Sequence, residues 1–223
     1  MKKLFVTATD TDAGKTYVAQ LLTYKLVLAK QQVAVFKPIS AGCQWQNKQL
    51  VNEDAQLLQA QANCQQQLDE INPIAFEPAI APHIAAQQLS QQIHLDDLAS
   101  YYQKVLQNPA DIVITEGAGG WRLPLGEQQY LSEFVQQSQQ DVILVVNMKL
   151  GCLNHAMLTY QAIINDGLNC LAWVANCYQE MPYLNENIAE LSSVFPMPLL
   201  GTLPYETDLT RAAKHLNIEP LLS

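Results

Sequence analysis

The stretch Thr7-Ala8-Thr9-Asp10-Thr11-Asp12-Ala13-Gly14-Lys15-Thr16-Tyr17 follows the short apolar run Leu4-Phe5-Val6 and precedes a helical pattern that begins at Val18. A strand, a polar loop ending in Gly-Lys-Thr and then a helix are the context of a phosphate-binding P-loop. In such a loop the backbone N–H groups at the helix N-terminus face the phosphates, where the helix dipole favours negative charge. Lys15 can reach the terminal phosphates, and the Thr16 hydroxyl can bind Mg²⁺. The stretch therefore predicts a site for nucleotide phosphates.

The loop departs from the strict P-loop pattern at its start. That pattern has a glycine five residues before Gly14, and this chain has Thr9 there. Gly-Lys-Thr alone is common by chance, so the stretch by itself also fits an ordinary helix start. The remainder of the chain decides between the two interpretations.

The chain is acidic, with a formal net charge of −9 over 223 residues. This charge disfavours generic binding to nucleic acid or to anionic membranes, so we expect neither as a partner. An anionic substrate would have to be held by individual lysines. No linker or internal repeat divides the chain, and its length suits one large domain, so we predict a single domain over residues 1–223.

Cysteine usage and the start of the chain indicate a cytoplasmic protein. The five cysteines are an odd number without paired or zinc-binding spacing, which is typical of free thiols in a reducing compartment. Met1-Lys2-Lys3 leads directly into the first strand and is too short for a signal peptide, and no apolar run approaches the ~18 residues of a membrane span. Two glutamine runs, 65–67 and 136–140, lie between periodic segments, and we predict that they face solvent.

Apolar strands alternate with helical patterns. The expected strands are 3–7, 33–36, 111–116, 142–147, 168–175 and 198–203, and the expected helices are 15–30, 53–62, 83–90, 95–106 and 153–165. The segment 72–82 carries three prolines and should be irregular. Continuous apolar strands separated by helices predict a mostly parallel sheet buried on both faces, the doubly wound α/β class.

Polar residues gather where these strands end. Beyond the P-loop, they include Lys37, Glu116, Lys149, Asn176 and the segment after Leu203. Ligands of parallel α/β sheets bind at the carboxyl ends of the strands, so we expect these residues to form one site.

Lys37, Glu116 and Asp54 are candidates for chemistry. Two lysines, Lys15 and Lys37, aimed at one anion suit phosphoryl transfer, although a strand-end lysine can equally be a solvated surface residue. Glu116 ends a buried strand and is placed like a second metal ligand opposite Thr16; the alternative is a cap for the glycine turn that follows. Asp54 begins a helix, where the dipole alone favours a carboxylate. A hydroxyl and two carboxylates are ligands that Mg²⁺ accepts beside phosphate oxygens.

A second helix start after a strand lies at Leu150-Gly151-Cys152-Leu153-Asn154-His155-Ala156. It could bind another anion, such as a substrate carboxylate, or be a plain turn into a helix. His83 and His155 lack a paired Ser or Cys nucleophile pattern, and we interpret both as structural residues near helix starts.

An ordered series of motifs resembles the dethiobiotin synthetase family, ATP-dependent enzymes of biotin biosynthesis. The P-loop is similar to the family's T-D-T-x-x-G-K-T, which has one extra residue between its glycines and so explains the failure of the strict pattern. The other matching stretches are Lys37-Pro38-Ile39-Ser40-Ala41-Gly42, Asn52-Glu53-Asp54-Ala55, Asn72-Pro73, Pro82-His83, Glu116-Gly117-Ala118-Gly119-Gly120-Trp121, Lys149-Leu150-Gly151-Cys152-Leu153-Asn154-His155-Ala156 and Trp173-Val174-Ala175-Asn176. They span nearly the whole chain in order, which makes the resemblance specific.

The resemblance implies a homodimeric enzyme that uses ATP, Mg²⁺, CO2 and 7,8-diaminononanoate. It implies that Lys15 and Lys37 are catalytic and that Thr16, Asp54 and Glu116 hold magnesium. The residues implied in ATP binding are Asp12, Ala13, Gly14, Lys15, Thr16 and Tyr17 at the phosphates, Asp54 and Glu116 at the metal, Gly117, Ala118 and Gly119, and then Asn176, Cys177, Pro204, Tyr205 and Glu206 near adenine. The residues implied in substrate binding are Thr11, Lys37, Ala41, Leu153 and Asn154, the last two across a dimer interface.

The chain departs from the family pattern at four positions. Ala8 replaces the first glycine of the loop, so its φ should not be positive. Asp12 stands where glutamate is frequent, and Cys177 stands where an acidic residue is common. Ala41 replaces a serine expected to contact the diamine, and we expect neighbouring Ser40, on a strand, to face elsewhere.

Three other functions fit parts of the pattern. One is a related P-loop enzyme that forms an amide or closes a ring on another substrate, which Ala41 leaves open. Another is an ATP-driven switch that binds partners; such switches carry a signature lysine early in the P-loop, where this chain has Asp10. The third is an inactive scaffold, which the presence of Lys15, Lys37 and Glu116 disfavours.

Overall fold

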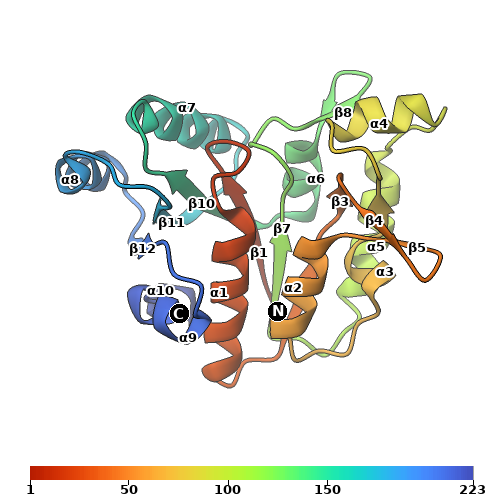
Figure 1. The fold of residues 1–223 in the computed structure, drawn as a ribbon, viewed down its shortest axis with the longest axis horizontal. Coiled ribbons are helices and arrows are strands. Elements are labelled where there is room, and N and C mark those ends of the chain that lie inside the picture. The colour runs from red at the N-terminus through yellow and green to blue at the C-terminus, as the bar shows by residue number, and fades with distance from the viewer. Residues whose placement is uncertain (223) are drawn as a thin grey trace.

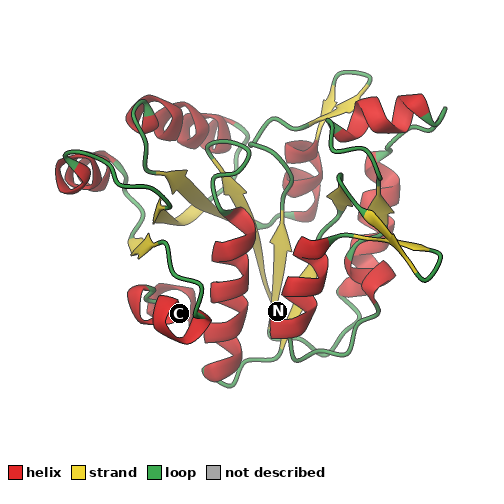
Figure 2. Cartoon of the chain, viewed as in Figure 1, coloured by secondary structure: helices red, strands yellow, loops and turns green. Residues whose placement is uncertain are grey.

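The computed structural model describes residues 1–222 and has a six-stranded parallel sheet at its centre (Figure 1). The strands lie in the order β12 (Leu199–Pro204), β11 (Cys170–Cys177), β10 (Asp141–Asn147), β1 (Lys2–Ala8), β7 (Ile112–Glu116) and β2 (Val33–Phe36). Helices cover both of its faces (Figure 2). The predicted doubly wound α/β class is confirmed.

The strands are continuously apolar because each face of the sheet has its own core. On β1, Leu4 and Val6 join one core and Phe5 joins the other, as the two-residue period of a strand requires. The helices on the Leu4 side are α1 (Lys15–Leu28), α2 (Glu53–Gln61), α9 (Leu209–Ala212) and α10 (Glu219–Leu222), with the 3-10 turn η1 (Ala213–His215). Those on the Phe5 side are α4 (Pro82–Gln88), α5 (Leu95–Val105), α6 (Leu131–Ser138), α7 (Cys152–Asn165) and α8 (Leu184–Val194).

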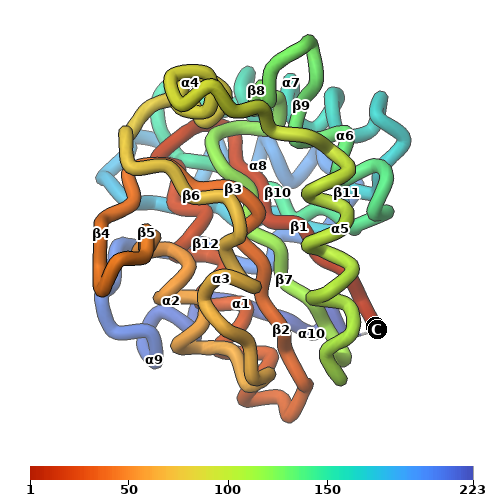
Figure 3. Tube along the Cα trace, turned by 90° about the vertical axis from the view of Figure 1, so that its right-hand side faces the viewer, coloured from red at the N-terminus to blue at the C-terminus, as the bar shows by residue number. Residues whose placement is uncertain are grey.

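The predicted strands and helices all exist, with ends that shift by at most two residues, but several short elements were not predicted. Two hairpins, β4 (Gln44–Gln46) with β5 (Gln49–Val51) and β8 (Pro124–Gly126) with β9 (Gln129–Tyr130), turn through pairs of residues with positive φ. Those turns use Asn47-Lys48 and Glu127-Gln128 instead of the glycine that usually marks them. The irregular segment 72–82 contains a two-residue strand, β6 (Ile74–Ala75), which pairs with β3 (Ile39–Ser40) beside the β4–β5 hairpin (Figure 3). Helices α6, α8, α9 and α10 and the short α3 (Leu68–Ile71) complete the set.

Segments without strand structure cover both edges of the sheet. Along β2, the Gln66 side chain accepts a hydrogen bond from Val35 N at 2.8 Å and donates one to Val35 O at 3.0 Å. Asn63 Oδ1 accepts from Val33 N at 2.7 Å farther along the same edge. Beside β12, Asn217 N donates to Leu200 O at 2.6 Å. These contacts occupy backbone groups that another chain could otherwise use to extend the sheet.

The prediction that both glutamine runs face solvent is wrong at two positions. Gln66 is buried because its amide replaces a neighbouring strand for Val35. Gln140 is buried after the last turn of α6, and its amide donates to Ser138 Oγ at 2.9 Å. In the same two runs, Gln65 and Gln137 are exposed, as expected.

The five cysteines are free thiols, as predicted. Within residues 1–222, the helices are all too short or too polar to cross a membrane.

Candidate active site

The candidate site lies where the chain changes direction in the sheet. After β1 the chain moves to edge strand β2, returns through β7 between them, and then proceeds through β10 to β12 on the other side. This switch point lies at the carboxyl ends of β1, β7 and β10, and doubly wound sheets bind ligands in the crevice at such a point. The P-loop begins there and is anchored to β10, since Thr9 N donates to Val145 O at 3.0 Å and Asn147 N donates to Thr9 Oγ1 at 3.3 Å.

The shape of the P-loop depends on two residues with positive φ. Asp12 has φ 56° and Gly14 has φ 87°. Gly14 also has no room for a side chain, because a Cβ would lie 2.1 Å from Asn176 Nδ2. Ala8 does not have a positive φ, which confirms the expectation for that position. The left-handed residue thus lies at Asp12, in the longer part of the loop, where Asp is among the residues that tolerate it.

Lys15 is buried at the start of α1, and its Nζ donates to the carbonyl of Asp10 in its own loop at 3.3 Å. Burial lowers the pKa of Lys15 to about 8, and the positive charge of Lys37 acts in the same direction. A bound polyphosphate would remove both penalties by supplying negative charge. The position of Lys15 is therefore suited to binding an anion such as a nucleotide phosphate.

Four predicted residues meet in one cluster, in which Lys37 and Glu116 are buried and Thr16 and Asp54 are half-buried. Lys37 Nζ donates to Glu116 Oε1 at 2.6 Å and lies 3.0 Å from Asp54 Oδ2. Thr16 Oγ1 donates to the same Glu116 oxygen at 2.8 Å. The elements that position them are the ends of β2 and β7 and the starts of α1 and α2. Asn52 caps α2 through its side chain, which fixes the turn that carries Asp54.

Charges in this cluster support one another. Burial alone would lower the pKa of Lys37, but the carboxylates of Glu116 and Asp54 outweigh it and the pKa is raised. Burial would raise the pKa of Asp54, but Lys37 outweighs it and the pKa is lowered. Burial raises the pKa of Glu116, which is fully enclosed. Lys37 is therefore a cation held by two acidic side chains, where the sequence predicted a lysine free to face an anion.

The donor set is suitable for magnesium. Glu116 Oε2 is buried and has no hydrogen-bond partner within residues 1–222, so one carboxylate oxygen is available for a cation. No group of three His, Cys, Asp or Glu side chains that could hold a metal exists in the same part of the chain. Mg²⁺ does not require one, because it keeps several waters and takes one or two carboxylates beside substrate phosphates.

The glycine turn after Glu116 packs closely against the sheet. A Cβ on Gly117 would lie 2.8 Å from the Phe5 ring, and Gly119 has φ 60°. Lys37 Nζ also donates to Gly117 O at 3.2 Å. Ala118 lies between them and is half-buried. The turn is thus part of the wall that holds Lys37.

Beyond this turn, a network that the sequence did not predict anchors the chain. Trp121 Nε1 and Arg122 both donate to the Asp166 carboxylate, at 2.8 Å and 2.7 Å, at the end of α7. A second unpredicted contact joins Lys149 Nζ to Asp10 Oδ2 at 2.8 Å. The sequence predicts that Lys149 lies at the carboxyl ends of the strands, but it does not indicate that Asp10 is its partner.

The residues expected near adenine lie at the ends of β11 and β12. Asn176 is buried, and its Nδ2 donates to Ala13 O at 2.9 Å, so its amide holds the P-loop. Cys177 pairs with Pro204 across the two strands, and Tyr205 and Glu206 follow. Burial raises the pKa of the Tyr17 phenol, and the charge of Glu206 raises it further. These residues therefore border the P-loop.

The residues expected to bind substrate lie on separate elements and do not form one cluster like that around Lys37. Thr11 is exposed on the P-loop, and Ala41 is half-buried in the loop after β3. Leu153 and Asn154 begin α7, half-buried and exposed respectively. Ser40 is buried and donates to Asn72 Oδ1 at 2.7 Å, as expected for a residue that faces away from the crevice.

Comparison with known proteins identifies the family. The sequence profile of the AAA domain family matches residues 2–213. ATP-dependent dethiobiotin synthetase BioD of Pseudoalteromonas translucida (strain TAC 125) is 49% identical over 208 residues, which cover 92% of this chain and 91% of that protein. The protein of the same name from Aeromonas salmonicida (strain A449) is 46% identical, with full coverage of both chains. The chain belongs to the ATP-dependent dethiobiotin synthetase family. The resemblance seen in the sequence motifs is thereby confirmed.

Solved structures agree on the fold of this dethiobiotin synthetase family member. A ParA family ATPase from Chlorobium tepidum TLS has a TM-score of 0.56 at 12% identity, with 99% of this chain and 94% of that one covered. The MinC:MinD cell division protein complex of Aquifex aeolicus has a TM-score of 0.55 at 10% identity, covering 98% and 88%. At such identity the likeness concerns the fold alone.

Proposed function

We propose that this chain is a cytoplasmic, magnesium-dependent dethiobiotin synthetase that acts on 7,8-diaminononanoate. One amino group adds to CO2 and loses a proton, forming a carbamate. A carbamate oxygen attacks the γ-phosphorus of ATP, and ADP leaves. The second amino group then attacks the carbonyl carbon of the mixed anhydride, phosphate leaves with the electron pair of the broken C–O bond, and the amine proton is lost as the cyclic urea closes.

The observation that supports this function best is the cluster of Thr16, Lys37, Asp54 and Glu116 at the P-loop, with Lys37 and Glu116 buried at its centre. Phosphoryl transfer is catalysed chiefly by positioning and by charge, and a cluster with fixed hydrogen bonds supplies both. Two lysines can share the negative charge that moves between carbamate, γ-phosphate and ADP. Family membership points to the same reaction.

Thr16, Asp54 and Glu116 are the residues that would hold Mg²⁺, and the ion would neutralise charge on the β- and γ-phosphates. Lys37 Nζ pairs with both carboxylates. We infer that its ammonium group turns from them towards the carbamate and the γ-phosphate when substrates bind. Lys15, whose Nζ donates to the backbone carbonyl of Asp10, would turn onto the phosphates.

The roles of the remaining site residues follow from the family resemblance. Asp12 to Tyr17 and the turn Gly117 to Gly119 surround the phosphates, and the segment of Asn176, Cys177 and Pro204 to Glu206 lies by the base. Thr11 and Ala41 face the diamine. The α7 N-terminus at Leu153 and Asn154 receives the carboxylate of a substrate bound to the other subunit of a homodimer. Leu150, which is 96% exposed beside this helix start, is an apolar residue that such a partner would cover.

One experiment tests the reaction. ADP release is measured with the purified protein while the diamine, bicarbonate and Mg²⁺ are omitted one at a time. We expect turnover only with all three, because the carbamate is the nucleophile. Equal ATP hydrolysis without the diamine would exclude a synthetase and favour the ATP-driven switch; turnover with another amine or carboxylate would favour the related cyclising enzyme.

A further inference from the structure

Residues 10–12 form the front half of the P-loop and lie at the surface of the protein. Asp10 is half-buried, Thr11 and Asp12 are exposed, and Asp12 has φ 56°. In the described part of the chain, one ion pair ties this segment to elements other than the loop itself and α1: Lys149 Nζ lies 2.8 Å from Asp10 Oδ2. The other hydrogen bonds of the segment are local. A surface segment with a single anchor of this kind gains freedom to move when the anchor is removed.

Asp10 uses three oxygen atoms to organise the loop. Its Oδ2 pairs with Lys149, its Oδ1 accepts from Thr11 N at 2.8 Å, and its backbone carbonyl accepts from Lys15 Nζ at 3.3 Å. The carboxylate therefore fixes the peptide that follows it, and the carbonyl of the same residue holds the lysine proposed to bind phosphates. A displacement of Asp10 would shift both Thr11 and Lys15.

Lys149 is well placed to act as this anchor because its backbone is fixed. It lies in the turn between β10 and α7, where Met148 N donates to Asn176 O of β11 at 2.9 Å and Cys152 N donates to Lys149 O at 2.9 Å. The side chains of the ion pair are 43% exposed at Lys149 and 45% exposed at Asp10. An ion pair this exposed contributes little to the stability of a fold, which argues for a role in the site.

We propose that Lys149 is a positioning residue for phosphoryl transfer, which acts through Asp10 to hold the front half of the P-loop in the conformation that receives the nucleotide phosphates. Small displacements of the groups around a reacting centre lower the rate strongly, and phosphoryl transfer depends on positioning more than on covalent chemistry. Lys149 thereby differs from Lys15 and Lys37, which are proposed to touch the phosphates themselves. The proposal rests on the proposed use of a nucleoside triphosphate by this site.

The test compares Lys149→Met, Asp10→Asn and the double variant with the wild type. The asparagine keeps an oxygen that can accept from Thr11 N, so Asp10→Asn removes the charge and leaves the local turn. Lys149→Arg keeps the positive charge and tests for rescue. Three quantities are measured for each variant: the affinity for a non-hydrolysable ATP analogue with Mg²⁺ by calorimetry, the rate of ADP release at saturating substrates, and the unfolding temperature.

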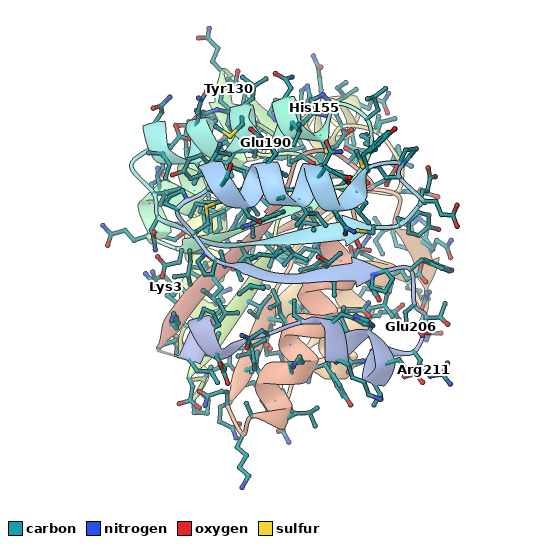
Figure 4. All side chains as sticks on the ribbon, turned by 90° about the vertical axis from the view of Figure 1, so that its left-hand side faces the viewer. Lys3, Tyr130, His155, Glu190, Glu206 and Arg211 are labelled. Carbon is teal, nitrogen blue, oxygen red and sulfur yellow. The ribbon has the colours of Figure 1, made fainter. Side chains whose placement is uncertain are left out.

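Lys104→Met is the matched control, because it removes the same charge from another part of the surface. Lys104 is exposed in the last turn of α5, which leads to the start of β7. The start of β7 pairs with β1 beside Lys3. Figure 4 shows Lys3 at the opposite end of the sheet from Glu206, which follows the carboxyl end of β12.

We expect Lys149→Met and Asp10→Asn to lower the rate of ADP release by about 10-fold or more, as small displacements in a reacting site do. Affinity for the ATP analogue should fall by about 5-fold or less, the limit for an exposed ion pair. The double variant should be no slower than the slower single variant, because each substitution removes the same contact. Lys149→Arg should recover most of the lost rate. Lys104→Met should behave as wild type, and unfolding temperatures should stay unchanged throughout.

Three results would overturn the proposal. Wild-type turnover in Lys149→Met would mean that the ion pair has no part in the reaction. Wild-type turnover in Asp10→Asn, with the double variant as slow as Lys149→Met, would mean that Lys149 acts on the substrates directly. Recovery of turnover in the double variant would mean that Lys149 only neutralises the Asp10 charge. If the wild type releases ADP without the diamine, the synthetase assignment fails, and the same variants still test the ion pair through that rate of ADP release.

Discussion

At the scale of single residues, Lys37 is the side chain whose surroundings matter most. It is buried between Glu116 and Asp54, and the Thr16 hydroxyl shares its Glu116 oxygen. A buried ion pair adds little net stability, but removing one partner leaves an uncompensated charge, which costs about 3–5 kcal/mol. A substitution of Lys37 is therefore expected to change both the stability of the protein and its turnover, and an experiment has to distinguish the two effects.

Replacing both Lys37 and Glu116 by neutral glutamines separates the effect on stability from the effect on catalysis. Lys37→Gln should lower turnover by ~10²-fold or more, because one preorganised charge contact is lost. It should also lower the unfolding temperature, since Glu116 stays buried without a cation. The double variant Lys37→Gln with Glu116→Gln removes both charges and can keep an amide–amide hydrogen bond, so the unfolding temperature should recover while turnover stays low.

Turnover and calorimetric unfolding of the two variants check this expectation. Lys48→Gln, in the exposed turn of the β4–β5 hairpin, is the control and should behave as wild type. Wild-type turnover in Lys37→Gln would remove Lys37 from the site. Recovery of turnover together with stability in the double variant would show that the ammonium group is structural.

Residues of the site differ in how far the sequence could predict them. Lys37 directly follows an apolar strand, Glu116 ends another, and Lys15 and Thr16 begin the helix that the P-loop joins to the first strand. Strand ends of a parallel sheet meet at one edge, so the meeting of these residues follows from pattern alone. That Lys37 binds the carboxylates could not be foreseen, because it depends on side-chain directions and on which strand lies between β1 and β2. The Asp10–Lys149 ion pair joins positions far apart in the chain, and no local pattern encodes such a pair.

At the scale of elements, the edge of β2 shows how a polar loop can replace a strand. Long apolar strands were predictable from composition, whereas Gln65, Gln66 and Gln67 have the same chemistry and only the middle one is buried. The difference arises from the backbone of Val35, whose N–H and C=O point out of the sheet and need partners. The fold class could therefore be predicted from the periodicity of apolar residues. The hydrogen bonds that Gln66 makes at the edge of the sheet could not.

Gln66→Ala tests this role. The change removes two hydrogen bonds and leaves buried backbone groups of Val35 unsatisfied, so we expect a loss of about 2 kcal/mol in the free energy of unfolding. Gln65→Ala, next to it but exposed, should change that free energy by less than about 0.5 kcal/mol. Urea unfolding followed by circular dichroism measures both. Equal effects of the two substitutions would mean that water replaces Gln66 at the edge without cost.

At the scale of the whole molecule, the start of α7 is the part of the proposed site that a second copy of the chain would share. Leu153 and Asn154 lie in the first turn of α7, and the turn before this helix carries the exposed Leu150 and Lys149, which pairs with Asp10 of the P-loop. A second copy that covers Leu150 would bring its own α7 start to this crevice. Two-fold symmetry then completes both sites at once.

Mixing two variants that both have low activity at limiting diamine tests whether the sites are shared. Asn154→Asp places a carboxylate where the substrate carboxylate should bind and should raise the KM for the diamine through like-charge repulsion. Lys37→Gln acts on the other side of the crevice. In a mixed dimer of these variants, one site carries both substitutions and the other carries neither, so equal mixing with subunit exchange should restore roughly one quarter of wild-type activity. Activity no greater than the sum of the separate variants, with exchange confirmed by light scattering and native mass spectrometry, would place Asn154 in the site of its own subunit.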